Sequence, residues 1–338
     1  MRPIVERGEA QRLLSMSEAS SPIPSNYFDG FRLPGMFSKE AVQSVIDYKP
    51  RDDDIFIVTY PKCGTTWSHH TLALILRHGE NFGENFKLMD SGPFLEMTGM
   101  EASTKVPRPC AFRTHLPFRL VPWSDKAKYI YVTRNPKDAC VSAFHHTQNI
   151  PGMDFKGTFD DFFEKFISGD IDCGDYFDHL EGWYKQRNRP NVLFVTYEEM
   201  KEDHEAVILK MASFVDDEKY GEPLRNDQQM LDNVLKYSSF KEMKPLLNKS
   251  MDDFFAMSAN NAEKSKMPES IQNMLSKVSE TKTDEDVAGK PKSCNFVRKG
   301  IIGDWRNHFS EEQSRRLDEK FAERTKNIEI PEIWKKYL

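Results

Sequence analysis

Cysteine is scarce in this chain and shows no recognisable spacing. No two cysteines form a C-x-x-C pair, and the five are Cys63, Cys110, Cys140, Cys173 and Cys294. An odd number without paired spacing argues against a disulfide framework and against a zinc site. We therefore expect a protein without a structural or catalytic metal.

Long apolar runs are also missing. No stretch approaches the roughly 20 consecutive apolar residues that a membrane helix needs. Residues 1–26 are mixed and charged, and they contain no apolar run suited to a signal peptide. These absences predict a cytoplasmic protein without a membrane partner.

An excess of charge of either sign is the third absence. The chain has 47 Lys and Arg against 53 Asp and Glu, which gives a net charge of −6. Such a chain has no global positive field to hold nucleic acid, so any polyanion must be bound by a local cluster. Apolar material is plentiful, with 38% hydrophobic and 12% aromatic residues among 338, enough for a large core.

The apolar material is arranged as short β-branched or aromatic runs between longer amphipathic segments. This pattern is typical of an α/β domain whose mostly parallel central sheet is flanked by helices. The expected strands are Ile55–Thr59, Ala111–Thr114, Lys128–Thr133 and Val192–Tyr197. Helices are expected over Thr66–His78, with Gly79 available to stop it, and from Pro136 onward.

The ends of the domain are set by composition. Residues 1–27 carry Ser and Pro clusters and are expected to form an N-terminal extension to a single domain over residues 28–338. Residues 258–292 are rich in Asn, Lys, Ser and Glu, so we expect a flexible, lid-like segment there.

The segment T-Y-P-K-C-G-T-T-W, residues 59–67, joins the first strand to the first helix. A helix N-terminus offers unpaired N–H groups, Gly64 allows the backbone to approach an oxyanion, and Lys62 adds a full charge. The segment therefore predicts a phosphate-binding loop, and an ordinary Thr-capped turn is the alternative. It does not match the pattern G-x-x-x-x-G-K-[ST], which argues against ordinary ATP chemistry.

Two further segments could hold a second phosphate. Arg134 follows the third strand, at the edge where open α/β sheets bind ligands, and Ser142 lies about two turns along the next helix. Arg298 and Lys299 precede Gly300, which combines a guanidinium fork, a point charge and a close backbone amide. A surface Arg with a helical Ser, and a solvated loop, are the alternatives.

These three segments, in this order, closely resemble the cytosolic sulfotransferases that use 3′-phosphoadenosine 5′-phosphosulfate (PAPS). The resemblance runs over about residues 26–309, and it implies transfer of a sulfuryl group to the hydroxyl of a small apolar phenol, steroid or alcohol. It implies that the 5′-phosphosulfate is wrapped by Lys62, Cys63, Gly64, Thr65, Thr66 and Trp67. It also implies that the 3′-phosphate is held by Arg134, Ser142, Arg298, Lys299 and Gly300, and the adenosine by Trp67, Tyr197, Ser238 and Phe240.

The segment F-R-T-H-L-P, residues 112–117, ends the second strand, and its lone His would more often be structural than catalytic. The family's catalytic base, however, is the His of a K-T-H-L-P segment, and His115 matches it. The resemblance implies that His115 takes the acceptor proton while Lys62 neutralises the leaving oxygen of 3′-phosphoadenosine 5′-phosphate (PAP). By the same analogy Ser142 holds Lys62 until the acceptor arrives.

Three positions depart from the family pattern. Arg113 stands where Lys is usual beside the catalytic His, and Cys63 replaces a common Ser in the loop. His146 falls where many relatives carry a Phe that lines the acceptor site, so the resemblance does not fix a phenol or steroid preference. We expect the acceptor pocket to include Phe94, Met97, Phe118, Phe144 and His146.

Other functions remain open at this point. The chain could be a PAPS-dependent dehydratase, which lets the sulfate leave as an olefin forms, or a PAPS-binding protein without turnover, or a magnesium-dependent phosphotransferase. Many relatives dimerise through a K-x-x-x-T-V-x-x-x-E segment, where this chain has Arg306, Ser310, Glu311 and Arg315. We therefore expect a monomer, or a homodimer that uses another surface.

Overall fold

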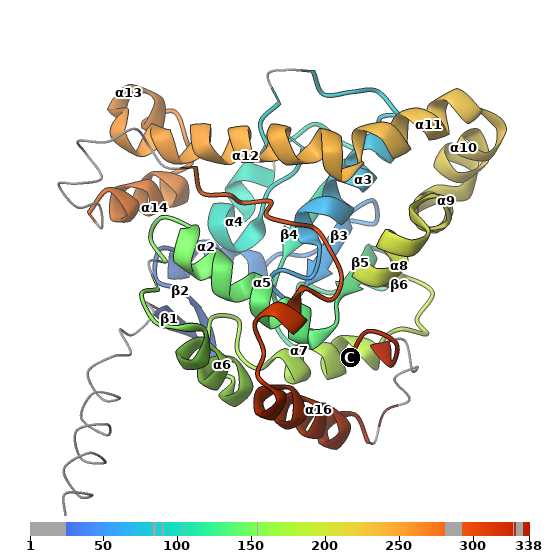
Figure 1. Cartoon of the computed structure of the whole chain (residues 1–338). Helices are drawn as coiled ribbons and strands as arrows, with labels where there is room; N and C mark the ends of the chain where they lie inside the picture. The colour runs from blue at the N-terminus through green and yellow to red at the C-terminus, as the bar shows by residue number, and fades with distance from the viewer. Residues whose placement is uncertain are drawn as a thin grey trace, which may run out of the picture.

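A parallel sheet of four strands, in the order β4-β3-β5-β6, lies at the centre of the fold (Figure 1). The computed structural model describes residues 25–83, 86–89, 91–103, 105–153, 155–280, 293–326, 328 and 334–338. The strands are β3 (Ile55–Thr59), β4 (Ala111–Thr114), β5 (Lys128–Thr133) and β6 (Val192–Thr196). The prediction of an α/β fold with a parallel sheet is confirmed, and β6 is shorter than predicted because Thr196 caps the next helix.

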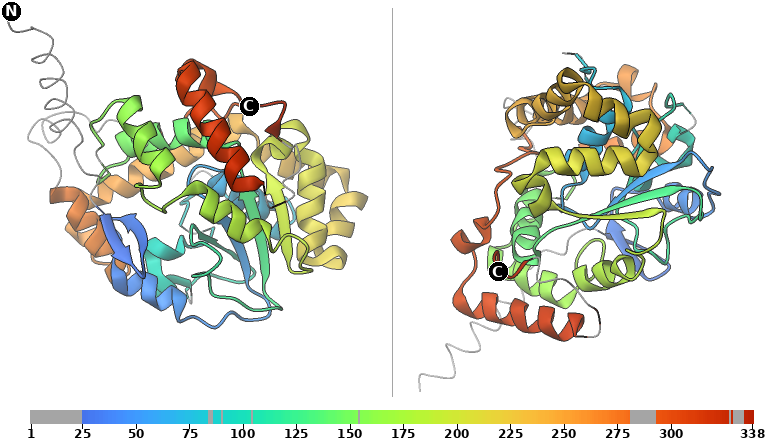
Figure 2. Two further views of the ribbon diagram at one scale, coloured as in Figure 1. Left: turned by 90° about the horizontal axis from the view of Figure 1, so that it is seen from below. Right: turned by 90° about the vertical axis from the view of Figure 1, so that its right-hand side faces the viewer.

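Alternate side chains of each strand enter two different cores, as the pleat requires. Along β3, Phe56 and Val58 belong to one core, whereas Ile55 and Ile57 belong to the other. Helices α6 (Phe159–Ser168) and α7 (Tyr176–Tyr184) contribute to the first core. The second core is built with α3 (Thr65–Leu76), α9 (His204–Asp216) and α11 (Gln228–Tyr237). The right-hand view of Figure 2 shows the strands running between two groups of helices.

The parallel register brings the carboxyl ends of the strands to one edge. Val58 lies opposite Thr114 on one side and Tyr131 on the other. The chain continues from β3 to β4 on one side and then to β5 on the other, so the strand order reverses at β3. Open α/β sheets bind ligands at such a reversal, outside the carboxyl ends. Lys62, His115 and Arg134 each follow a strand at this edge.

The remaining elements complete the two layers around the sheet. The first part of the chain adds a hairpin of β1 (Ser25–Phe28) and β2 (Phe31–Pro34), then α2 (Lys39–Ile46) and α4 (Leu95–Ser103). The middle part adds α5 (Pro136–Asn149), α8 (Tyr197–Glu202), η1 (Asp217–Gly221) and α10 (Glu222–Asn226). The last part adds α12 (Phe240–Ala256), η2 (Met257–Ala259), α13 (Asn261–Lys264), α14 (Glu269–Glu280), η3 (Asp304–Asn307) and α16 (Glu311–Thr325).

The helix that follows the phosphate-binding loop differs from its prediction. It begins at Thr65 after Gly64, whose φ is 105°, and no side chain caps its first turn. The alternative of an ordinary Thr-capped turn is therefore wrong, and the first N–H groups stay available for a ligand. Every side chain from Ser68 to Leu76 is buried, so α3 is a central helix without the predicted amphipathic stripe.

Two predicted peripheral segments are more ordered than expected where the structure describes them. Residues 25–27 belong to β1, which pairs with β2, so the domain begins before residue 28. Within 258–292, helix α14 buries Ile271, Met274, Leu275 and Val278. That spacing is the apolar face of a helix, which the polar composition concealed. Residues 1–24 and 281–292 lie outside the described residues.

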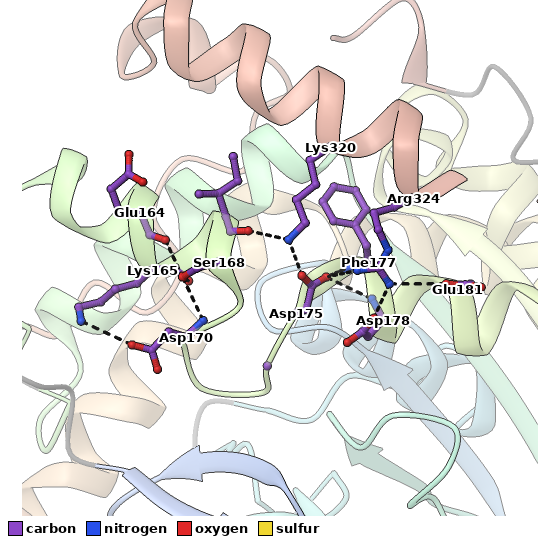
Figure 3. Close-up of polar contacts among 12 residues, drawn as sticks. Glu164, Lys165, Ser168, Asp170, Asp175, Phe177, Asp178, Glu181, Lys320 and Arg324 are labelled. Atoms are coloured by element: carbon purple, nitrogen blue, oxygen red, sulfur yellow. Dashed lines mark hydrogen bonds and ion pairs between the residues drawn. The ribbon is translucent and has the colours of Figure 1, made fainter. Parts of the chain in front are cut away.

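Charged side chains of helix α16 form ion pairs with residues of α6 and α7 and of the segment between them (Figure 3). Lys320 pairs with Asp175, and Arg324 pairs with Asp178. Asp175 also caps α7 by accepting the backbone N–H of Phe177 at 2.7 Å. Ser310, at the position of the family's usual dimer segment, caps α16. Among the described residues, no helix has the length and apolar character needed to cross a membrane.

Candidate active site

A cavity of about 830 Å³ is enclosed by the loops that follow the strands and by α5, α12 and the segment before η3. Most residues predicted to bind donor or acceptor line it. They are Lys62, Gly64, Thr65, Thr66, Trp67, Phe94, Met97, Arg113, His115, Arg134, Ser142, His146, Tyr197, Phe240, Arg298, Lys299 and Gly300. The structure thus brings together segments that lie far apart in the sequence.

The phosphate-binding loop has a backbone shape that few residues tolerate. Both Lys62, with φ 68°, and Gly64, with φ 105°, are in the left-handed region. A Cβ on Gly64 would approach Cδ2 of Tyr197 to 3.1 Å. The hydroxyls of Thr59 and Thr65 lie 2.6 Å apart, which ties the end of β3 to the first turn of α3. Cys63 is buried in the core. Having Cys here in place of the family's usual Ser therefore removes no hydroxyl from the cavity.

Arg134 links three segments around the cavity. Its guanidinium donates to the carbonyl oxygen of Ile301 at 2.8 Å and lies over the ring of Tyr197 at 4.2 Å from the centroid. A longer contact of 3.4 Å reaches the carbonyl oxygen of Lys62. Arg134 is therefore held rigidly at the cavity wall, which suits recognition of an anion.

Asp304 gathers the two cations of the R-K-G segment. It accepts from Arg298 at 2.6 Å and from Lys299 at 2.8 Å. Burial opposes its ionisation, but the hydrogen bonds from Lys299 and Arg298 outweigh burial and hold the pKa of the carboxyl below its usual value. The sequence analysis missed Asp304, although an acid six residues after Arg298 and five after Lys299 could have indicated it.

Aromatic side chains form a separate wall. Trp67 and Tyr197 meet edge to face with centroids 5.3 Å apart, and the Trp67 indole N–H donates to the carbonyl oxygen of Ser238 at 2.9 Å. Ser238 does not line the cavity, because its buried hydroxyl donates to Val234. Among the described residues, its contact with the cavity wall is this hydrogen bond to Trp67. Lys201, one turn after Tyr197 on α8, also lines this wall and was missed.

His115 has one ring nitrogen fixed by the backbone. Nδ1 lies 2.8 Å from the carbonyl oxygen of Thr59, which can only accept, so Nδ1 carries the proton and Nε2 is left as a base. Burial lowers the pKa of His115 to about 4, outweighing that hydrogen bond. Its backbone N–H donates to Oε1 of Glu96 at 2.5 Å. The imidazole is therefore neutral near pH 7.

Lys62 reaches a partner that the resemblance did not imply. Its Nζ lies 3.2 Å from Nδ1 of His146 and 5.1 Å from the centroid of Phe296. Burial and the charge of Arg134 lower the pKa of Lys62 to about 8. Ser142 lines the same cavity, but among the described residues the hydrogen bond of Lys62 goes to His146.

Arg113 is turned toward the backbone of a neighbouring loop. It donates to the carbonyl oxygen of Gly92 at 2.8 Å, and burial lowers its pKa to about 10 although Glu96 acts in the opposite direction. Both Nε of Arg113 and Oε2 of Glu96 are buried without a hydrogen-bond partner in the described part of the chain. Arg113 thus contributes charge to the cavity wall.

Two residues predicted for the acceptor pocket lie elsewhere. Phe118 packs against Trp123 and Trp183, and Phe144 packs against Phe159 and Phe162. Neither lines the cavity, so these two predictions are wrong. For Phe144 the reason is helical geometry, because two residues after Ser142 a side chain points to the opposite face of α5.

Comparison with known proteins adds independent evidence. The family described as "Sulfotransferase domain" matches residues 52–272 and 249–329. The chain is 34% identical over 298 residues to the amine sulfotransferase of Oryctolagus cuniculus, covering 87% of each chain. This chain belongs to the sulfotransferase family. The resemblance stated from the motifs is confirmed, and so is the prediction of a sulfotransferase enzyme.

Other sulfotransferases match over similar lengths. Sulfotransferase 2B1 of Homo sapiens is 30% identical over 322 residues, with 93% of this chain and 78% of that protein covered. Among solved structures, mouse sulfotransferase SULT7A1 complexed with PAP is 28% identical, with a TM-score of 0.66 over 93% of this chain and 98% of that one. A retinol dehydratase with androsterone and PAP shares the fold at 21% identity, with a TM-score of 0.68 over 96% of this chain and 95% of that one.

Proposed function

We propose that this sulfotransferase moves a sulfuryl group from PAPS to the hydroxyl of a bulky apolar acceptor, with His115 as the base. The observation that carries the proposal is the 2.8 Å hydrogen bond between His115 Nδ1 and the carbonyl oxygen of Thr59. It selects the tautomer in which Nε2 can accept a proton at the cavity.

The residues around the cavity suit PAPS at three places. The uncapped N-terminus of α3, with Lys62, fits a 5′-phosphosulfate. The cations Arg134, Arg298 and Lys299 all line the cavity, and such a set of positive side chains fits a 3′-phosphate. The aromatic wall fits an adenine ring. The relative SULT7A1 has been solved with PAP, which supports the same donor here.

The transfer proceeds in line and needs no metal. His115 Nε2 takes the proton of the acceptor hydroxyl as the acceptor oxygen bonds to sulfur. The bond between sulfur and the bridging oxygen breaks, and PAP leaves with that oxygen. The Lys62 ammonium neutralises the charge that grows there, so most of the catalysis is positioning and electrostatics.

The acceptor is proposed from the apolar part of the cavity. This wall consists of flexible or aromatic side chains, among them Met36, Phe37, Met97, Met153, Phe255 and Met274. Methionine adapts its shape to an irregular partner and offers almost no hydrogen bonding. Such a wall favours a bulky apolar alcohol or phenol over a polar sugar.

An amine acceptor is the second candidate. Glu96 and Asp172 line the cavity, and each has one buried carboxylate oxygen without a hydrogen-bond partner in the described part of the chain. Burial raises the pKa of Glu96 to about 7 and that of Asp172 to about 6, although hydrogen bonds to both carboxyls act in the opposite direction. Each carboxyl could accept a hydrogen bond from an amine, and one relative is an amine sulfotransferase.

The test is a screen of the purified full chain with labelled PAPS and a panel of apolar alcohols, phenols, steroids and amines. Formation of a sulfate ester with release of PAP supports the proposal, and a sulfamate supports the second candidate. An olefin product would indicate a dehydratase, and PAPS binding without product would indicate a silent binding protein. Activity that requires magnesium and ATP would contradict both candidates.

A further inference from the structure

The partner of Lys62 is the starting point. An ammonium carries three donors and no acceptor, so Nδ1 of His146, 3.2 Å away, must accept. His146 is therefore neutral, with its remaining proton on Nε2. Burial lowers the pKa of His146 well below its usual value, and the charge of Lys62 acts in the same direction. The bond is a contact between a cation and a neutral ring.

The other surroundings of the Lys62 ammonium offer no competing anion. The ring of Phe296 lies 5.1 Å away, and the same ring packs against His146 with centroids 5.9 Å apart. No described carboxylate forms an ion pair with Lys62. A bond to a neutral acceptor is weaker than one to an ionised oxygen, so Lys62 can exchange His146 for an anionic donor oxygen.

The position of His146 on α5 explains why its side chain can hold Lys62. His146 follows Ser142 by one turn, so both side chains lie on the cavity face of the same helix. The imidazole is longer than a serine hydroxyl and extends to Lys62. His146 and the proposed base His115 line the same cavity.

We propose that His146 is the positioning residue that holds the Lys62 ammonium in the resting enzyme, a role that the resemblance gave to Ser142. Both His115 and His146 line the cavity, so an acceptor bound there displaces Lys62 from His146 and frees it for the bridging oxygen. Without acceptor, Lys62 stays on His146, and attack by water on PAPS is suppressed. The inference rests on the proposed function for its catalytic consequence, but the Lys62–His146 pair itself does not.

The first experiment tests the pair without PAPS. The rate at which an acetylating reagent modifies Lys62 at pH 7 is measured by mass spectrometry in the full chain. His146→Phe removes the acceptor that favours the charged form, and a fall of about one pKa unit would raise the modification rate about fivefold. His146→Asn, whose Oδ1 replaces Nδ1, should restore the wild-type rate, whereas His146→Gln, which places its amide near Nε2, should not.

The second experiment measures release of sulfate and PAP from PAPS without acceptor. His146→Phe should raise this hydrolysis relative to transfer by about tenfold, the effect of losing one hydrogen bond to a charged group, and His146→Asn should bring it back. Gln148→Ala, on the exposed side of α5, is the control for general effects on the helix. Ser142→Ala should weaken PAPS binding without changing Lys62 modification.

The outcomes separate the inference from the proposed function. Unchanged Lys62 modification in His146→Phe, or a rise in Ser142→Ala alone, would overturn the inference. A rise in modification together with unchanged hydrolysis would also overturn it, because the pair would then not restrain Lys62. Failure of the wild type to bind PAPS at all would instead contradict the proposed function.

Discussion

The indole N–H of Trp334 donates a hydrogen bond of 3.0 Å to Oε2 of Glu198. The other oxygen of Glu198 accepts the backbone N–H of Asn135 at 3.0 Å, directly after Arg134. The side chain of Asn135 in turn donates to the carbonyl oxygen of Tyr337. Residues near the end of the chain therefore brace the strand end that presents Arg134 to the cavity.

Trp334→Phe tests this brace. The change keeps most of the buried ring but leaves a buried carboxylate oxygen without its donor, so the free energy of unfolding should fall by about 1–3 kcal/mol. Denaturant unfolding measures this, and the affinity for PAP should fall as well. Trp123→Phe is the matched control, because its bond to the exposed Asp125 should contribute much less. Equal effects of the two changes would remove the special role of Glu198.

The pH dependence of turnover follows from His115 and Lys62. His115 must be neutral to accept a proton, and its pKa of about 4 keeps it so above that pH. Lys62 must be charged, and its pKa of about 8 removes that charge at higher pH. The value of kcat/KM for the acceptor should therefore be flat between these limits and fall on both sides. A single acidic limb near pH 6.5 would contradict the assignment of His115.

His115→Ala and Lys62→Met separate proton transfer from charge stabilisation. His115→Ala should nearly abolish turnover with PAP affinity almost unchanged, because Nε2 contacts the acceptor and not the nucleotide. Lys62→Met should lower kcat by about 10²-fold or more, as loss of one oxyanion donor does. Single-turnover kinetics with calorimetric PAP binding measures both. Loss of PAP binding in His115→Ala would refute its role.

The 3′-phosphate contacts predict strong discrimination between nucleotides. A charge-assisted contact contributes roughly 1.5–3 kcal/mol, so PAP should bind at least about a hundredfold more tightly than 5′-AMP. Arg298→Ala should erase much of this preference and raise the apparent constant for PAPS more than it lowers kcat. Competition binding checks this without an acceptor. Equal affinity of the wild type for PAP and 5′-AMP would contradict the assignment of PAPS as donor.

Gly300 predicts a steric effect on nucleotide binding. A Cβ at this position would lie 2.4 Å from Cε2 of Phe240, and φ is 62°. Gly300→Ala should therefore displace Phe240 and weaken PAP binding at least about tenfold, beyond the roughly 1–2 kcal/mol of backbone strain. Gly30→Ala is the control, because its φ is 70° but its Cβ would meet nothing within 4 Å. The same PAP affinity in both variants would contradict the contact.

The sequence predicted the strands because these depend on local signals, whereas His115 and the adenosine-binding residues were assigned only through the family resemblance. Short β-branched runs such as Ile55–Thr59 favour buried strands, and ligand residues at their carboxyl ends follow from parallel topology. The prediction of acceptor-pocket residues failed where the direction of a side chain decides whether it lines the cavity. Phe144 and His146 are two residues apart on α5, yet only His146 faces the cavity.

Long-range partners could not be predicted either. Trp334 and Glu198 are 136 residues apart in the sequence, and only the tertiary fold brings them into contact. The apolar face of α14 was present in the sequence but was hidden by its polar neighbours. Polar composition alone therefore separates a surface helix poorly from an irregular segment.

Asp304 has a consequence for the catalytic cycle. Arg298 and Lys299 already share its carboxylate before any nucleotide arrives. A 3′-phosphate thus competes with the Asp304 carboxylate for these two side chains. Its binding free energy is therefore less favourable than it would be with two unpaired cations. The pairing with Asp304 therefore limits the affinity of the site for PAP. By limiting this affinity, the pairing of Arg298 and Lys299 with Asp304 would favour release of PAP after the transfer.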